Sequence, residues 1–192
     1  LWKQTGSTIN NTGIGRFSAT GKFDAYGNIM SLLYGDNFIN QTTLSSNYVF
    51  KQLFYANKYL VSAANLKLPA TTLSQYCYQQ MFRGCTSLNH APELPATTLV
   101  KNCYEQMFYG CTALTTAPDL LATTLVQSCY RDMFNGSSLN YVKCLATNKS
   151  ATYCTKDWLV DVTATGTFVK DANTTWSTGS DGIPSWWTVQ NA

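Results

Sequence analysis

The sequence predicts an α/β fold in which stacked repeats share one continuous core. A block of about 26 residues occurs three times. It reads LPATTLSQYCYQQMFRGCTSLNHAPE from Leu68, LPATTLVKNCYEQMFYGCTALTTAPD from Leu94 and LLATTLVQSCYRDMFNGSSLNYVKC from Leu120. A period of roughly 20–29 residues, with one strand and one helix per unit, is typical of a leucine-rich-repeat solenoid. A single unit cannot bury its own apolar face, so the units must stack and expose an extended surface.

Each block predicts a short helix in its first half. In the block from Leu68, the apolar residues follow the spacing i, i+4, i+5, i+8 and i+9, which is a helical stripe. Thr72 and Gln75 suit a capping box before the helix, and Gly84 suits a left-handed residue after it. The polar positions between the apolar ones predict a solvated outer face. The stripe consists of Leu73, Cys77, Tyr78, Met81 and Phe82.

The second half of each block predicts a short strand. Leu88, Ala91 and Leu94 are its expected inward residues, while Pro92 and Pro95 keep it from becoming a long central strand. The predicted architecture is therefore a solenoid with short parallel strands on one face, short helices opposite, and irregular caps at both ends.

One continuous domain with three parts is expected. Residues 1–43 form an N-terminal capping segment. Residues 44–144 hold the leucine-rich repeats, of which the first copy is divergent. Residues 145–192 form an irregular last unit, with a strand over 166–170, and a Trp-rich C-terminal cap. Caps of different sequence are needed because a bare end would expose the core.

Composition excludes several classes of protein. Charged residues make up 12% of the 192 residues, the net charge is +3, and the lysines are scattered. No nucleic-acid footprint is visible, and no apolar run approaches the ~20 residues of a membrane span. No signal-peptide pattern opens the chain. The abundance of Thr, Ser, Asn and Gln suits an extracellular or bacterial cell-surface location.

Five of the seven cysteines occupy repeat positions, which predicts rows of free, buried thiols. Side chains on stacked parallel strands point the same way and fit a disulfide poorly. Cys144 and Cys154 lie outside the regular positions, and whether they are bridged stays open. The odd number leaves at least one free thiol within a monomer.

The pattern LPATTL…CY..MF.GCTSL..APELPATTL resembles the BspA-like leucine-rich-repeat surface proteins of Bacteroides and relatives. The flanks YGNIMSLLYGDNF, VKCLATNKSATYCTKDWL and GTFVKDANTTWSTGSDGIPS resemble these proteins as well. The resemblance implies an exported protein whose repeats adhere to host or bacterial partners, with no catalytic residues. Departures from the pattern are Leu121 for Pro, Ser137 for Cys, and Trp186 for a small residue.

Residues that point outward from the predicted strands are the candidates for binding, because stacking places them in adjacent rows on one face. Their variation between copies also fits ordinary solvated surface. Glu93 and Asp119 should lie side by side, where paired carboxylates do acid–base work or bind a cation weakly, although an exposed acidic row is the commoner outcome. The candidates are Asn89, His90, Glu93, Thr116, Asp119, Tyr141, Lys143 and, at the C-terminal end, Trp186.

The cluster Trp176, Trp186 and Trp187 could stack on sugar rings or seal the end of the stack. No metal, cofactor or catalytic residue is expected. The sequence favours a non-enzymatic, surface-exposed adhesin that recognises host or bacterial surface proteins through the strand face, with glycans as the alternative partner. The alternatives are a carbohydrate-binding module that uses the C-terminal tryptophans, and a structural component of a larger surface or phage-associated assembly. The ligand and the oligomeric state stay open.

Overall fold

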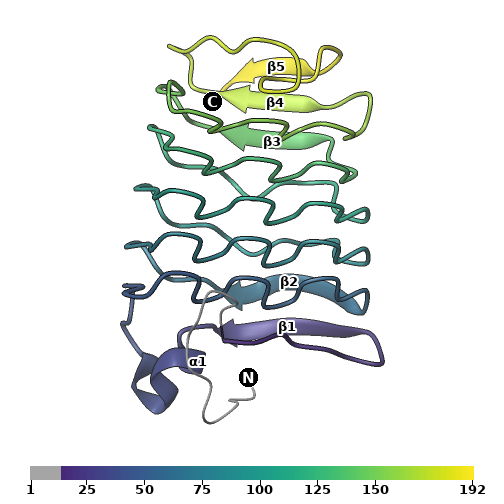
Figure 1. The fold of residues 1–192 in the computed structure, drawn as a ribbon. Coiled ribbons are helices and arrows are strands. Elements are labelled where there is room, and N and C mark those ends of the chain that lie inside the picture. The colour runs from purple at the N-terminus through teal and green to yellow at the C-terminus, as the bar shows by residue number, and fades with distance from the viewer. Residues whose placement is uncertain (1–13) are drawn as a thin grey trace.

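The computed structural model describes residues 14–192, which wind through successive circuits stacked along one direction (Figure 1). We call each circuit a rung. The three sequence copies, 68–93, 94–119 and 120–144, form consecutive rungs in the middle of the stack, and hydrogen bonds join each rung to the next. The repeat in the sequence is therefore also a repeat in space.

Short parallel strands line one side of the stack. β1 (Phe23–Asn28) pairs with β2 (Leu60–Lys67), which forms one two-stranded sheet. β3 (Tyr141–Cys144), β4 (Thr167–Lys170) and β5 (Thr188–Asn191) form a second sheet in sequence order. The expected parallel strands are confirmed, and β4 confirms the strand expected over 166–170.

Between these sheets the middle rungs are extended but only bridged at single positions. Ser62 bridges to His90, and Thr116 bridges to Tyr141. Pro92 follows two residues after the bridge at His90, and proline has no backbone N–H to donate to a ladder. The prolines thus keep these segments from forming regular strands, as the sequence predicts.

Helices are few among residues 14–192: α1 (Ser31–Tyr34) and the 3-10 helix η1 (Gly35–Phe38), both before the first repeat copy. The helix predicted in each repeat is wrong, because that stretch is a series of tandem turns. Tyr76, Gln80 and Gly84 have φ angles of 59°, 57° and 72°. A residue at positive φ every fourth position interrupts any right-handed helix. Gly84 does adopt the left-handed conformation expected of it, but within a turn.

Backbone hydrogen bonds on this turn side alternate between two directions. The Met81 N–H donates to the Tyr78 carbonyl of the same rung at 3.1 Å. The N–H groups of Tyr78 and Phe82 instead donate to Cys103 and Met107 of the next rung, at 3.0 and 2.9 Å. An α-helix would satisfy these groups internally. Here every second N–H ties neighbouring rungs together.

The core between the strand side and the turn side consists of rows of like residues. Phe54, Phe82, Phe108 and Phe134 stack with ring centroids 5.4, 5.4 and 5.6 Å apart and an angle of 3° between adjacent planes. A parallel row contains Tyr78, Tyr104, Tyr130 and Trp158. The methionines of the three copies are fully buried, which confirms their predicted place in the core: Met81, Met107 and Met133.

The two ends are closed by different means. At the N-terminal end, α1 and η1 follow β1 beside the first rungs, and residues 1–13 of the expected cap lie outside the described residues. At the C-terminal end, Trp176 continues the aromatic row by stacking on Trp158 at 5.3 Å. Trp187 is buried, and its Nε1–H donates to the Thr163 carbonyl at 3.0 Å. Trp176 and Trp187 therefore pack against the C-terminal end of the core.

All seven cysteines are buried and free. The expectation of free thiols at the repeat positions is confirmed, and Cys144 and Cys154 are not bridged. None of the helices within residues 14–192 is both long enough and apolar enough to cross a membrane.

Candidate functional site

The outward residues predicted from the sequence lie along the strand side of neighbouring rungs. His90 pairs with Ser62 of β2, Thr116 pairs with Tyr141 of β3, and Tyr141 pairs with Thr167 of β4. His90 and Thr116 are exposed and Tyr141 is half-buried, while the adjacent Ala117 and Val142 are buried. The alternation places one set of side chains in the core and the other on the surface.

Asn89 and His90 form a polar pair on a fixed backbone. The Asn89 N–H donates to the Val61 carbonyl at 2.9 Å, and the His90 carbonyl accepts from the Ala63 N–H at 2.9 Å. The exposed side chains meet at 2.7 Å between Asn89 Oδ1 and His90 Nδ1. These hydrogen bonds fix the position of the imidazole. Its Nε2 atom takes no part in the contact with Asn89.

Asp119 and Lys143 form an ion pair between adjacent rungs, with Lys143 Nζ 2.8 Å from Asp119 Oδ2. This carboxylate accepts a hydrogen bond from the ammonium group and raises the pKa of Lys143. Asp119 therefore does not act with Glu93 as a pair of free carboxylates, the arrangement that acid–base chemistry or cation binding would need. Within residues 14–192, Glu93 has no ion pair.

Two adjoining hollows open beside these residues where the strands end. The larger one has a volume of about 810 Å³ and is lined by Tyr26, Lys67, Glu93 and Pro95, among others. The smaller one, of about 480 Å³, shares Glu93 and Pro95 and reaches Asp119. We call the two together the strand-end hollow. It arises where prolines prevent neighbouring rungs from closing a ladder.

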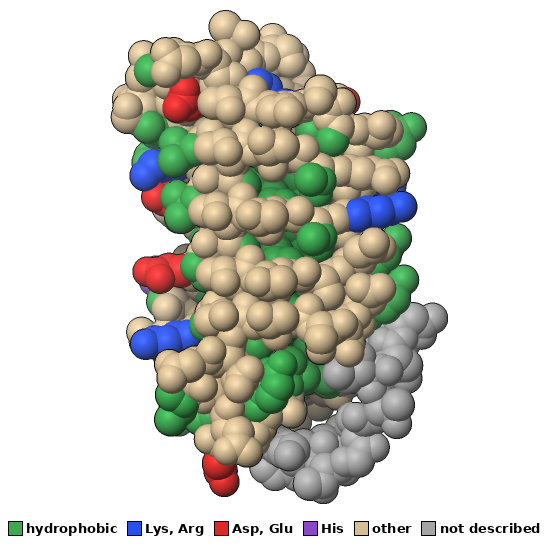
Figure 2. Space-filling view, turned by 90° about the vertical axis from the view of Figure 1, so that its left-hand side faces the viewer, with side chains coloured by type: hydrophobic (Ala, Val, Ile, Leu, Met, Phe, Trp, Pro, Cys, Tyr) green, Lys and Arg blue, Asp and Glu red, His purple; other side chains and the backbone are tan. Residues whose placement is uncertain are grey.

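Figure 2 looks onto the side of the stack where the strands end. Hydrophobic side chains, in green, and backbone with uncharged polar side chains, in tan, cover its middle, and charged side chains of both signs lie toward its edges. Tyr26 is 70% exposed at the N-terminal end of the strand-end hollow. Sequence reasoning missed Tyr26, which lies before the repeats, and Lys67, which ends the divergent first copy. It assigned Pro92 and Pro95 only a structural role.

The remaining predicted site residue, Trp186, lies apart from the strand-end hollow at the C-terminal end of the stack. Its side chain is 79% exposed, whereas its neighbour Trp187 is buried. Gly166 allows the Trp187 ring to pack closely, since a Cβ on that glycine would lie 2.6 Å from the indole. The tryptophan cluster therefore divides into two rings that seal the end and one that faces solvent.

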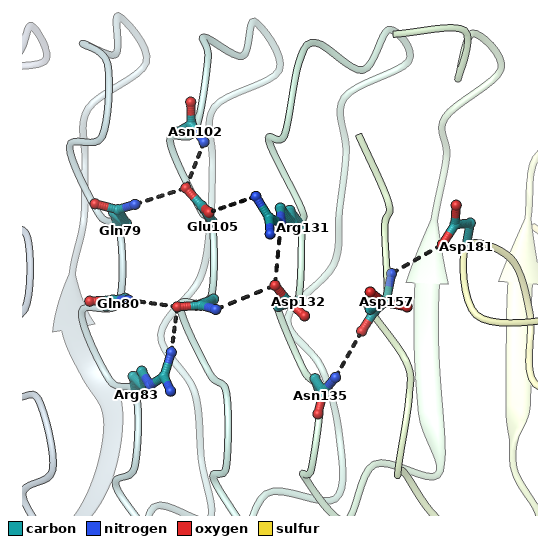
Figure 3. A network of polar contacts seen from close by, with 11 residues as sticks. Gln79, Gln80, Arg83, Asn102, Glu105, Arg131, Asp132, Asn135, Asp157 and Asp181 are labelled. Atoms are coloured by element: carbon teal, nitrogen blue, oxygen red, sulfur yellow. Dashed lines mark hydrogen bonds and ion pairs between the residues drawn. The ribbon is translucent and has the colours of Figure 1, made fainter. Parts of the chain in front are cut away.

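A polar network on the turn side was also missed (Figure 3). The Gln80 amide donates to Gln106 Oε1 at 2.6 Å and accepts from Gln52 at 2.5 Å. Gln106 donates in turn to Asp132 Oδ2 at 3.3 Å and accepts from Arg83. The repeat of Gln at one position of successive copies was the available signal. These amides form a ladder, whereas the sequence suggested a freely solvated face.

A second row of the network is organised around Glu105, which is 9% exposed. Its Oε2 atom accepts from Gln79 at 2.8 Å and from Asn102 at 2.6 Å. Its Oε1 atom lies 3.8 Å from the Arg131 guanidinium. The charge is thus balanced by donors from three successive rungs, which makes this carboxylate a structural group that links them.

The buried thiols are unreactive as nucleophiles at neutral pH. Burial raises the pKa of Cys77 and of Cys85 to about 12 and raises the pKa of Cys111 as well. Cys111 donates through Sγ to the Phe82 carbonyl at 3.1 Å. A thiol must ionise to act as a nucleophile, so these rows serve packing. The described residues contain no group of three or more His, Cys, Asp or Glu side chains placed to hold a metal ion.

Comparison with models of known protein families, with curated proteins and with solved structures finds no match to this chain.

Proposed function

We propose that this chain is a leucine-rich-repeat-type solenoid, similar to the BspA-like surface proteins. We propose further that it is a non-enzymatic adhesin, exposed at a bacterial cell surface or outside the cell. Its partner is a host or bacterial surface protein, which it recognises on the strand side. The 26-residue repeat, the parallel strands and the inter-rung hydrogen bonds support the first statement.

The strand-end hollow carries the second statement. It is a continuous concave surface with an exposed tyrosine, four proline rings and the carboxylate of Glu93, which has no ion-pair partner among residues 14–192. Exposed aromatic side chains are common anchors at protein interfaces because they offer large rigid area with one polar group. We propose as occupant an extended protein segment that carries apolar side chains and a cation opposite Glu93.

The test compares binding of three forms of the chain to immobilised extracellular-matrix proteins and to whole bacterial cells. The forms are the native chain, the strand-side variant and a matched control with three exposed turn-side residues replaced. The strand-side variant is His90→Ala, Glu93→Ala and Tyr141→Ala; the control is Gln75→Ala, Lys101→Ala and Gln127→Ala.

Binding that is lost in the strand-side variant and kept in the control supports the proposal. Equal binding by both variants overturns the assignment to the strand side. If the native chain binds no matrix protein and no cell, the structural component of a larger assembly replaces the adhesin.

One observation favours a second function, carbohydrate binding at the C-terminal end. Trp186 is 79% exposed, and a solvent-facing indole offers a flat apolar surface against which a sugar ring can stack. A glycan array probed with the native chain and with Trp186→Ala tests this function. The control is Ile39→Ala, which removes another exposed apolar side chain, 67% exposed, near the opposite end.

A further inference from the structure

A third hollow lies at the C-terminal end of the stack, away from the strand-end hollow. It has a volume of about 240 Å³, and its lining includes Lys149, Tyr153, Lys156, Trp176 and Asp181. This volume is below the roughly 300–1,000 Å³ that is usual for drug-sized ligands. It therefore suits one small ring or a compact ionic group.

The walls of this hollow are held by the core. Trp176 stacks on Trp158 at 5.3 Å and meets Phe168 edge-on at 5.2 Å. Elsewhere in the lining, the Thr155 hydroxyl donates to the Asp181 carbonyl at 2.8 Å. The Asp157 N–H donates to Asp181 Oδ1 at 3.2 Å (Figure 3). The segment that contains Asp181 is thus tied to the rung beneath it.

Two ammonium groups are held over aromatic rings at this hollow. Lys149 Nζ lies 4.7 Å from the centroid of Trp176 and donates to Thr174 Oγ1 at 3.1 Å. Lys156 Nζ lies 5.1 Å from the centroid of Tyr153. Cation–π contacts of this kind hold an ammonium group in place without neutralising it.

The charges at the hollow are unequal. Neither lysine has a carboxylate partner within 4.0 Å among residues 14–192. Asp181, the carboxylate of the lining, already accepts hydrogen bonds from the Asp157 N–H and the Ser180 hydroxyl. Each ammonium group has three N–H donors. Both lysines therefore retain donors for an acceptor that the protein does not supply.

We propose that this hollow binds a small ligand that carries a compact oxyanion, namely the carboxylate or sulfate group of an acidic sugar. The two ammonium groups meet the oxyanion, and the polar wall formed by Thr155 and Ser177 borders the sugar ring. Lys149 covers the face of Trp176, so charge and hydrogen bonding, and not ring stacking on that indole, dominate recognition. This site is independent of the strand-end hollow and of Trp186.

The test is a calorimetric titration of the whole chain with four probes: glucuronic acid, N-acetylglucosamine 6-sulfate, inorganic phosphate and neutral glucose. The variants are Lys149→Ala, Lys156→Ala and the double replacement. Lys101→Ala serves as the control, because it removes an exposed lysine on the turn side. Thermal melting of each variant, compared with that of the native chain, separates lost binding from lost folding. Lys149→Arg, which keeps the charge, is the second check.

We expect the two acidic sugars to bind and glucose not to bind. Each single lysine replacement should raise the Kd of the acidic sugars about tenfold, while Lys101→Ala and Lys149→Arg change it little. The affinity should fall as salt is added, because exposed charges are screened. Binding of phosphate as strong as that of the acidic sugars would assign the site to the oxyanion alone and overturn the role of the ring. Equal binding by the double variant, or no binding of either acidic sugar, overturns the site itself.

Discussion

The rings of Phe82 and Phe108, which are 26 residues apart in the chain, lie nearly parallel with centroids 5.4 Å apart. This centroid distance lies within the range of offset-stacked aromatic pairs. Backbone hydrogen bonds join the same two rungs, since the Phe82 N–H donates to the Met107 carbonyl at 2.9 Å. The row of rings therefore fills the core at the spacing that the hydrogen-bonded backbone allows.

Met107 tests the assignment of the middle row to the core. Replacement by Ala should lower the free energy of unfolding by about 2–5 kcal/mol, because the fully buried side chain leaves a cavity between two other rungs. Urea denaturation measures the change, and Lys101→Ala on the exposed turn side is the control. If Met107→Ala unfolds at the same urea concentration as the native chain, the row does not belong to the core.

Gly110 tests the left-handed turn positions. Its φ is +67°, a conformation that costs a residue with a side chain about 1 kcal/mol. Gly110→Ala should therefore lower the melting temperature. Gly21→Ala is the matched control, because nothing lies within 4 Å of its added Cβ and its φ is not in the left-handed range. A similar melting temperature for the two variants would contradict the turn geometry.

Glu105 tests the network that joins three rungs. Glu105→Ala leaves the Gln79 and Asn102 amides without their shared acceptor, which should cost about 1–3 kcal/mol of unfolding free energy. Chemical denaturation gives the value. Glu93→Ala removes an exposed carboxylate and should change stability far less. Equal effects of the two replacements would show that the network does not stabilise the fold.

The buried thiols predict weaker stability at alkaline pH. Burial raises the pKa of Cys77 from 9.0 to about 12, so the folded chain holds this proton more tightly than the unfolded chain does. The stabilisation is complete below the unfolded pKa and is lost as pH rises toward the folded value. The free energy of unfolding, followed by urea denaturation, should therefore fall between about pH 9 and pH 12.

Cys111→Ser provides the comparison for this prediction. Ser137 occupies the equivalent position of the third copy and donates to the Phe134 carbonyl at 2.6 Å, so a hydroxyl fits the site. The variant lacks one thiol of raised pKa and should lose less stability between the two pH values. An unchanged slope would mean that this thiol does not contribute to the pH dependence.

Much of the core could be predicted from the sequence, because identical residues at equal spacing must form rows once the repeats stack. The tandem turns could not be predicted, because their four-residue spacing resembles the 3.6-residue period of an α-helix. Leu73, Cys77, Met81 and Cys85 are spaced by four residues, and in an α-helix the last would lie about 120° round from the first. Over two helical turns, residues spaced by four stay close to one face of a helix, so the two patterns look alike. Over three turns they move off that face. Cys85 continues the four-residue spacing and was the available sign that the stretch is not a helix.

The candidate sites were predicted unevenly for a similar reason. The strand-side row follows from the repeat, so His90, Thr116 and Tyr141 could be placed in neighbouring rungs. The hollow beside Lys149 joins segments of the last, irregular rungs, where no repeat relates the residues that meet. Its cation–π contacts depend on the path of the chain around Trp176, which no local pattern in the sequence records.

The alternation of hydrogen bonds on the turn side has a consequence for how such a chain can change its length. A rung donates through every second N–H to the rung that follows, and left-handed residues lie in register from one rung to the next. A deletion of one whole block, such as residues 94–119, would place matching donors and acceptors opposite one another again. A short deletion within the turn side would set left-handed positions against right-handed ones. The rest of a rung can vary in length, since the left-handed Ser128 and Tyr153 of neighbouring rungs are 25 residues apart, one fewer than the repeat. Variants of this architecture should therefore differ by complete rungs or by changes outside the turn side.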